Sequence, residues 1–249
     1  MIASRNNHAE RLNPRVFCWT RFGVEAGETA QSIFERKEVE RVRNGGVFLW
    51  GIGHSIRPSL AGLLARTTRP EIIFSPMKSA PSLHDARPAE VTLWCEATDL
   101  SDKPFSMPEH SLVTSRRGSR NPSRHHYALV CESQTSITSS EIDQDQIAIG
   151  NLRNLISGTI VGSSQVTSVV RQVAETQLTG TEYPIAARAR LVYPYHIRLG
   201  NGVAIPRDLR LDCIGGAMSE RIMDSLLRLR KNESERSQIA CDPVLPCGP

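Results

Sequence analysis

The sequence predicts an α+β fold: a mixed or antiparallel β pseudo-barrel with helices at its openings, followed by a part that combines helices and strands. Two short apolar segments, 47–51 and 72–74, have the pattern of buried strands and end beside glycine, proline or basic residues. The first 132 residues give the order strand, helix, strand, helix and then three strands. A doubly wound sheet would need a helix after every strand, so this order favours an irregular barrel.

Each element of this first half has a local signal. The segment 16–22 is apolar and ends at Gly23, which predicts the first strand. A helix is predicted over 27–43, because Thr29 is a suitable N-cap and Asn44-Gly45 a suitable C-cap. The charged residues of this helix predict a solvated face with ion pairs one turn apart. The remaining elements are a short helix over 58–65 and strands over 91–97 and 127–131.

The second half of the chain is less regular. A polar segment rich in serine, threonine and acidic residues, 134–145, indicates a boundary or a surface loop. Four valines between 166 and 173 recur at helical spacing, which predicts a helix capped by Ser163 or Ser164. The other predicted elements are a short helix over 151–157, strands over 185–192 and 195–199, and a final helix over 214–230.

These elements divide the chain into four parts. Residues 1–14 are expected to be a flexible lead-in, and residues 15–132 to form the barrel domain. Residues 133–230 are expected to form a C-terminal portion that packs on the barrel or mediates self-association into a homo-oligomer. The last segment, 231–249, is polar with prolines near its end, which predicts a disordered tail.

Composition and charge narrow the class of protein. The 249 residues carry a formal net charge of +4, which allows a polyanionic partner without requiring one. No apolar run approaches the roughly 18 residues that a transmembrane helix needs, and the polar N-terminus lacks the apolar segment of a secretory signal. We therefore expect a cytoplasmic protein that does not enter a membrane. The 6 cysteines form no C-x-x-C pair, so we expect reduced thiols and no bound metal.

Three features of the first half resemble the PUA-like superfamily and, within it, the EVE and ASCH branches. They are Trp19 on an early strand, the turn and strand over 44–50 (Asn-Gly-Gly-Val-Phe-Leu-Trp), and a later strand that runs into the Ser75-Pro76 corner. The resemblance covers about residues 16–131 and implies a small pseudo-barrel. Several such domains bind RNA or modified DNA bases, so the resemblance also implies a nucleobase at the barrel mouth.

The tryptophans are the candidates for holding a base. Trp19, Trp50 and Trp94 lie on three predicted strands, and a base would stack on them if their side chains met in one mouth with the corner 75–78. The alternative is that these large rings fill the core. The predicted ligand-binding residues are Trp19, Trp50, Trp94, Phe22, Ser75, Lys78 and Tyr127.

Candidates for holding phosphate lie in two segments. The loop over 115–124 is rich in glycine, serine, proline and arginine, and its arginines would follow a phosphate backbone unless the loop is simply solvated. Free amides at the start of the predicted valine-rich helix would suit an anion, and ordinary N-capping by a serine is the alternative. The predicted phosphate-binding residues are Arg116, Arg117, Arg120, Arg124, Ser163 and Ser164.

These candidates predict a nucleic-acid-binding module that recognises a nucleobase, modified or unmodified, by aromatic stacking and holds phosphates with arginine. An alternative from another class is an enzyme acting on a nucleotide or a phosphorylated small molecule, with the phosphate at Ser163-Ser164. A third alternative is an interaction subunit without a ligand, whose tryptophans would be buried. No cofactor is expected, no residue is assigned a catalytic role, and the sequence leaves open whether there is catalysis.

Overall fold

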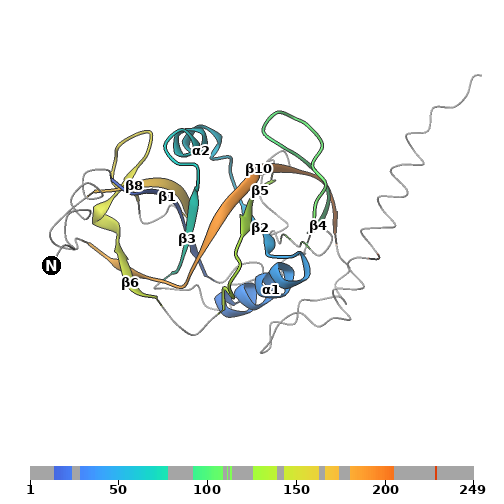
Figure 1. Cartoon of the computed structure of the whole chain (residues 1–249), viewed down its shortest axis with the longest axis horizontal. Helices are drawn as coiled ribbons and strands as arrows, with labels where there is room; N and C mark the ends of the chain where they lie inside the picture. The colour runs from blue at the N-terminus through green and yellow to red at the C-terminus, as the bar shows by residue number, and fades with distance from the viewer. Residues whose placement is uncertain are drawn as a thin grey trace, which may run out of the picture.

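The computed structural model of the protein describes residues 14–23, 29–77, 92–108, 111, 113, 126–138, 143–162, 166–173, 180–204 and 228. This part of the chain has the predicted α+β character, with two α-helices and ten strands (Figure 1). The helices are α1 (Ala30–Arg43) and α2 (Arg57–Leu64). The strands are β1 (Val16–Phe22), β2 (Val47–Ile52), β3 (Glu71–Pro76), β4 (Thr92–Thr98), β5 (His126–Glu132), β6 (Asp143–Ala148), β7 (Leu152–Asn154), β8 (Thr167–Gln172), β9 (Glu182–Ile185) and β10 (Ala187–Ala204), with a short 3-10 turn over Ile149–Asn151.

Eight of the described strands form one mixed sheet. Their order is β2-β5-β10-β3-β1-β8-β7, with β4 pairing along the later part of β10. The β1–β3 ladder is parallel and the other ladders of this sheet are antiparallel. The prediction of a barrel is wrong, because the order ends at β2 on one side and β7 on the other, with no ladder between them among the described strands. Strands from before and after residue 132 are mixed in this sheet, because β10 lies between β5 and β3.

The sheet carries apolar clusters on both faces. The inner face packs against α1 and α2 through the largest cluster, which includes Phe34, Leu60 and Leu63. On the outer face, the β6–β9 pair covers one half and the segment after β4 covers the other half. In Figure 1, α2 and α1 lie above and below the strands, and β6 and β4 lie toward opposite sides.

Helix α1 has the caps that the sequence predicts and ends at Arg43 as predicted, but it begins at Ala30 and not at residue 27. Thr29 is the N-cap, its hydroxyl accepts the backbone N–H of Ser32 at 3.1 Å, and the Ser32 hydroxyl accepts the N–H of Thr29 at 2.9 Å. Asn44 is the C-cap, and Gly45 follows with φ +63°, a left-handed conformation that glycine adopts without steric cost. These caps are local in sequence, which explains why the prediction is confirmed.

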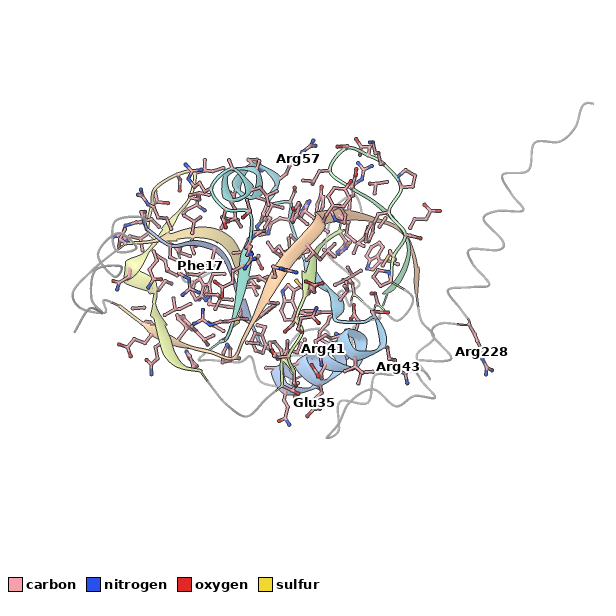
Figure 2. All side chains as sticks on the ribbon, viewed as in Figure 1. Phe17, Glu35, Arg41, Arg43, Arg57 and Arg228 are labelled. Atoms are coloured by element: carbon pink, nitrogen blue, oxygen red, sulfur yellow. The ribbon has the colours of Figure 1, made fainter. Side chains whose placement is uncertain are left out.

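The charged face of α1 is less solvated than predicted. Arg36, Lys37 and Glu40 are each at most 3% exposed, so part of this face is buried against the protein. Glu35 lies on the outer side of the same helix (Figure 2). The prediction of a fully solvated face is therefore wrong for three of its charged residues.

Several predictions for the second half of the chain are also wrong. The predicted helix over the four valines is strand β8, which lies between β1 and β7. The predicted helix over 151–157 is instead β7 followed by a turn, and the two strands predicted over 185–192 and 195–199 are parts of the single long strand β10. The final helix predicted over 214–230 lies outside the described residues except for Arg228, which is helical.

Candidate functional site

An open groove of about 420 Å³ lies on the outer face, where neither cover reaches. It is formed by the start of β3, the end of β5 and the first part of β10, together with the residues that flank them. We call it the arginine groove, because three of its lining side chains are arginines. Its residues are Arg69, Glu71, Glu132, Ser133, Gln134, Arg188, Ala189 and Arg190.

Strand register places the charges of the groove in one row. Arg190 of β10 lies directly opposite Glu71 of β3 on one side and Glu132 of β5 on the other. Directly opposite residues of an antiparallel pair share a face, so the three side chains lie together on the outer face. Arg190 pairs with Glu132, and the Nη1 atom of Arg188 lies 3.3 Å from Oε1 of Glu71.

Arg15, just before β1, extends this row. Its Nη2 atom lies 2.6 Å from Oε2 of Glu71. Among the described residues, the guanidinium groups of Arg15, Arg69, Arg188 and Arg190 lie beside two carboxylates, an excess of two positive charges. These ion pairs are partly exposed and stabilise the fold little, so the excess charge is their more informative property.

Arg69 is the groove residue best placed to take a ligand. It is exposed, and its guanidinium has no hydrogen-bond or ion-pair partner in the described part of the chain. Arginine presents a planar fork of donors that matches two oxygens of a phosphate or a carboxylate. The groove therefore has the chemistry of an anion site, with Ser133 and Gln134 as further polar groups at its rim.

The arginine groove was missed by the sequence prediction, which placed phosphate contacts elsewhere. A signal for part of it was present, because Arg188 and Arg190 alternate with apolar residues in a predicted strand and so share one face. Arg69 carries no such signal, since its place beside β10 depends on the pairing of β3 with β10.

The structure does not bring the three tryptophans together. Trp19 belongs to the outer cluster under β6 and β9, and Trp50 belongs to the inner cluster. Trp94 is half-buried at the edge of the third cluster, and its ring centroid lies 4.8 Å from that of His126. A shared cage of these three rings is therefore not formed.

Two of the other predicted ligand residues, Ser75 and Phe22, contact these tryptophans. The Nε1 group of Trp19 donates to Oγ of Ser75 at 3.0 Å, and both side chains are buried. The rings of Phe22 and Trp50 lie 6.0 Å apart, edge to face. In the structure Ser75 and Phe22 thus have core contacts.

The remaining predicted site residues cannot be placed on the fold. Lys78, the four arginines of the 115–124 loop, and Ser163 with Ser164 lie outside the described residues. They stay predictions. The helix predicted to begin near Ser164 is strand β8 in the structure. The enzyme alternative, which placed a phosphate at the start of that helix, therefore has no such helix start. The residues concerned are Lys78, Arg116, Arg117, Arg120, Arg124, Ser163 and Ser164.

A second polar feature, also missed from the sequence, lies inside the fold. His196 is 1% exposed, and neither of its ring nitrogens has a hydrogen-bond partner among the described residues. Its ring stacks on the predicted ligand residue Tyr127, with centroids 5.1 Å apart and planes at 17°. Burial and the nearby charge of Arg57 lower the pKa of His196 to about 4, so it is neutral at pH 7. No motif or spacing marks this histidine.

Two of the cysteines, Cys18 and Cys131, are poor nucleophiles. Cys18 and Cys131 are free and buried. Burial raises the pKa of the Cys18 thiol to about 12, and it raises the pKa of Cys131 well above the usual range. Among the described residues, histidine, cysteine, aspartate and glutamate side chains form no cluster of three or more that would hold a metal ion. The arginine groove thus stands as the candidate site.

No family model, curated protein or solved structure matches this chain. Neither helix in the described part of the chain is long and apolar enough to cross a membrane.

Proposed function

We propose that this chain is a nucleic-acid-binding module that holds backbone phosphates in the arginine groove. The observation that carries the proposal is the row of guanidinium groups on an open sheet face, with an excess of two positive charges and with Arg69 available. Phosphate contacts by arginine supply most of the sequence-independent affinity of such proteins. The PUA-like resemblance of the first half remains part of this proposal.

The loop over 115–124 fits the same function. Its arginines lie outside the described residues; the loop precedes His126, the first residue of β5, and the groove residue Glu132 is at the other end of that strand. We expect charge removal at Arg116, Arg117 and Arg120 to weaken oligonucleotide binding on all sequences alike.

The test measures binding of a labelled oligonucleotide by fluorescence anisotropy between about 50 and 200 mM salt. Three phosphate contacts predict a slope of log affinity against log salt near −2, which is a loss of about tenfold or more over this range. Arg69→Gln should weaken binding and make this slope shallower by roughly 1. Affinity that does not change with salt would contradict the proposal.

The matched control is Arg57→Gln, which removes the same charge from an exposed arginine. Arg41 contacts the groove residue Ser133, because its Nη1 atom donates to the Ser133 carbonyl oxygen at 3.2 Å. Figure 2 shows Arg57 at the top of the molecule and Arg41 toward the bottom, so Arg57 lies away from the groove. Equal losses for Arg57→Gln and Arg69→Gln would show that overall charge, and not the groove, determines binding.

A further inference from the structure

Strand β10 contains a wide bulge beside the arginine groove. Leu191 lies opposite Cys131 of β5, and the next ladder pair joins His196 to Leu129. Residues 192–195 therefore stand against the single residue Val130 of β5, so the chain leaves the plane of the sheet here. On its other side, β10 pairs with β3 up to residue 190 and with β4 from residue 198 onward, so its neighbour changes at the bulge.

The bulge presents one aromatic ring to solvent. Tyr193 is 74% exposed, and it is the aromatic residue among the large apolar side chains exposed in the described part of the chain. Its neighbours are held by the protein, because Val192 packs on the outer cluster and Tyr195 on the inner one. The bulge is thus anchored on both sides while its ring points outward.

The backbone of the bulge has an uncommon conformation. Tyr195 has φ +66°, a region that residues other than glycine rarely adopt. Such outliers persist only where the surrounding structure holds them, and they concentrate at functional sites. The ring of Tyr195 meets that of Tyr193 edge to face, with centroids 6.2 Å apart. The Tyr193 ring is therefore supported by the partly buried ring of Tyr195.

The exposed ring lies within reach of the groove. Tyr193 is three positions after Arg190, so their Cα atoms are at most about 11 Å apart even if the chain were fully extended. A phosphate held at Arg190 would therefore place a neighbouring base near the tyrosine ring. In a duplex the bases are paired and stacked on one another, whereas an unpaired base offers its face.

We propose that Tyr193 stacks an unpaired base of single-stranded DNA or RNA whose phosphates occupy the arginine groove. This inference rests on the proposed function and assigns its ligand class. The base-stacking role predicted for three tryptophans is thereby assigned to one exposed tyrosine. The ligand is a single strand, and its sequence matters little because every base has a face that stacks.

The test compares three labelled ligands of equal length by fluorescence anisotropy: a single strand, its duplex, and an abasic single strand. DNA and RNA forms of the single strand are run in parallel, and either one suffices. Wild-type protein should bind the single strand about tenfold more tightly than the abasic strand, the effect of one stacked base. It should also bind the single strand more tightly than the duplex.

Two variants locate the effect. Tyr193→Ala should weaken binding of the normal single strand about tenfold, with unchanged salt dependence and little further loss on the abasic strand. Tyr193→Phe keeps the ring and should bind within about threefold of wild type. Because the side chain is exposed, thermal melting of both variants should match that of the wild type.

The outcomes separate the two proposals. Full binding by Tyr193→Ala together with weakened binding by Arg69→Gln would overturn the stacking role and leave the phosphate groove standing. Equal affinity for duplex and single strand would also overturn the stacking role. Absence of binding to every oligonucleotide would overturn the proposed function and this inference with it.

Discussion

The Nζ atom of Lys37 lies 2.7 Å from Oε2 of Glu40, one turn further along α1, and both side chains are buried. The other carboxylate oxygen of Glu40 accepts the backbone N–H of Leu49 at 2.7 Å. Leu49 belongs to β2, the first strand in the sheet order, so this carboxylate joins helix α1 to the edge of the sheet. A buried ion pair of this kind is costly to break because one charge is left behind.

We therefore expect Glu40→Gln to lower the free energy of unfolding by about 3–5 kcal/mol. Glu35→Gln on the same helix, at a side chain that hydrogen-bonds to Gln31 near the surface, should change it by less than about 0.5 kcal/mol. Urea denaturation followed by circular dichroism measures both. A change below about 1 kcal/mol for Glu40→Gln would show that the pair contributes little.

The stability of the protein should depend on pH through His196. Its pKa of about 4 lies below the value near 6.5 of an unfolded histidine, so between these values the unfolded chain binds the proton and the folded chain does not. The free energy of unfolding should consequently fall by roughly 1–3 kcal/mol as pH drops through this window. Urea titrations at a series of pH values measure this fall.

His196→Phe removes the titrating group and keeps a ring against Tyr127, so it should flatten this part of the pH profile. His54→Gln, at an exposed histidine, is the control and should keep the wild-type profile. An unchanged profile in His196→Phe would assign the acid sensitivity to other groups.

Trp50→Ala should destabilise the fold before it affects any ligand. The indole is 7% exposed, and its ring centroid lies 4.7 Å from Phe74 and 6.0 Å from Phe34. Removing a buried aromatic ring costs about 3–5 kcal/mol. Tyr193→Ala serves as the exposed control, and thermal and urea unfolding measure both. A folded Trp50→Ala protein of wild-type stability would contradict this placement of Trp50.

Gly51 and Gly53 differ in the space that is available for a side chain. A Cβ at Gly51 would lie 2.6 Å from Cγ1 of Val113, whereas a Cβ at Gly53 would meet nothing within 4 Å. Gly51→Ala should therefore cost about 1–3 kcal/mol from overpacking, and Gly53→Ala should be neutral or slightly stabilising. Val113→Ala in the Gly51→Ala background should recover part of the loss, a coupling that a double-mutant cycle in urea measures. Additive effects would contradict the contact.

The parts of the fold that could be predicted are those with local causes. Thr29 and Asn44-Gly45 fix the ends of α1 within a few residues of sequence, and the strands over 47–52 and 71–76 are short apolar segments bounded by turns. In contrast, Val169 and Val170 are adjacent and both buried, because β8 is covered on both faces. Such a strand loses the alternation that would distinguish it from a helix.

The candidate site was harder to predict for the same reason. Arg190 acquires its role from Glu71 and Glu132, which are distant in sequence and meet it through strand pairing. Likewise, the burial of Arg36 depends on what covers α1 and not on the helix itself. Tyr193 was not singled out, because its exposure follows from a bulge that no local turn signal announces.

The late position of β8 and β10 in the chain has a consequence for synthesis. The hydroxyl groups of Thr20 and Thr167 lie 2.8 Å apart although 147 positions separate them. Strands β3 and β5 likewise lack their shared neighbour until β10, which lies between them in the sheet, has been synthesised. Contacts so distant in sequence form slowly, and unpaired strand edges invite aggregation. A ribosome-bound chain that ends before β10 therefore exposes two apolar edges at once, and the sheet is completed only after residue 204 has been added.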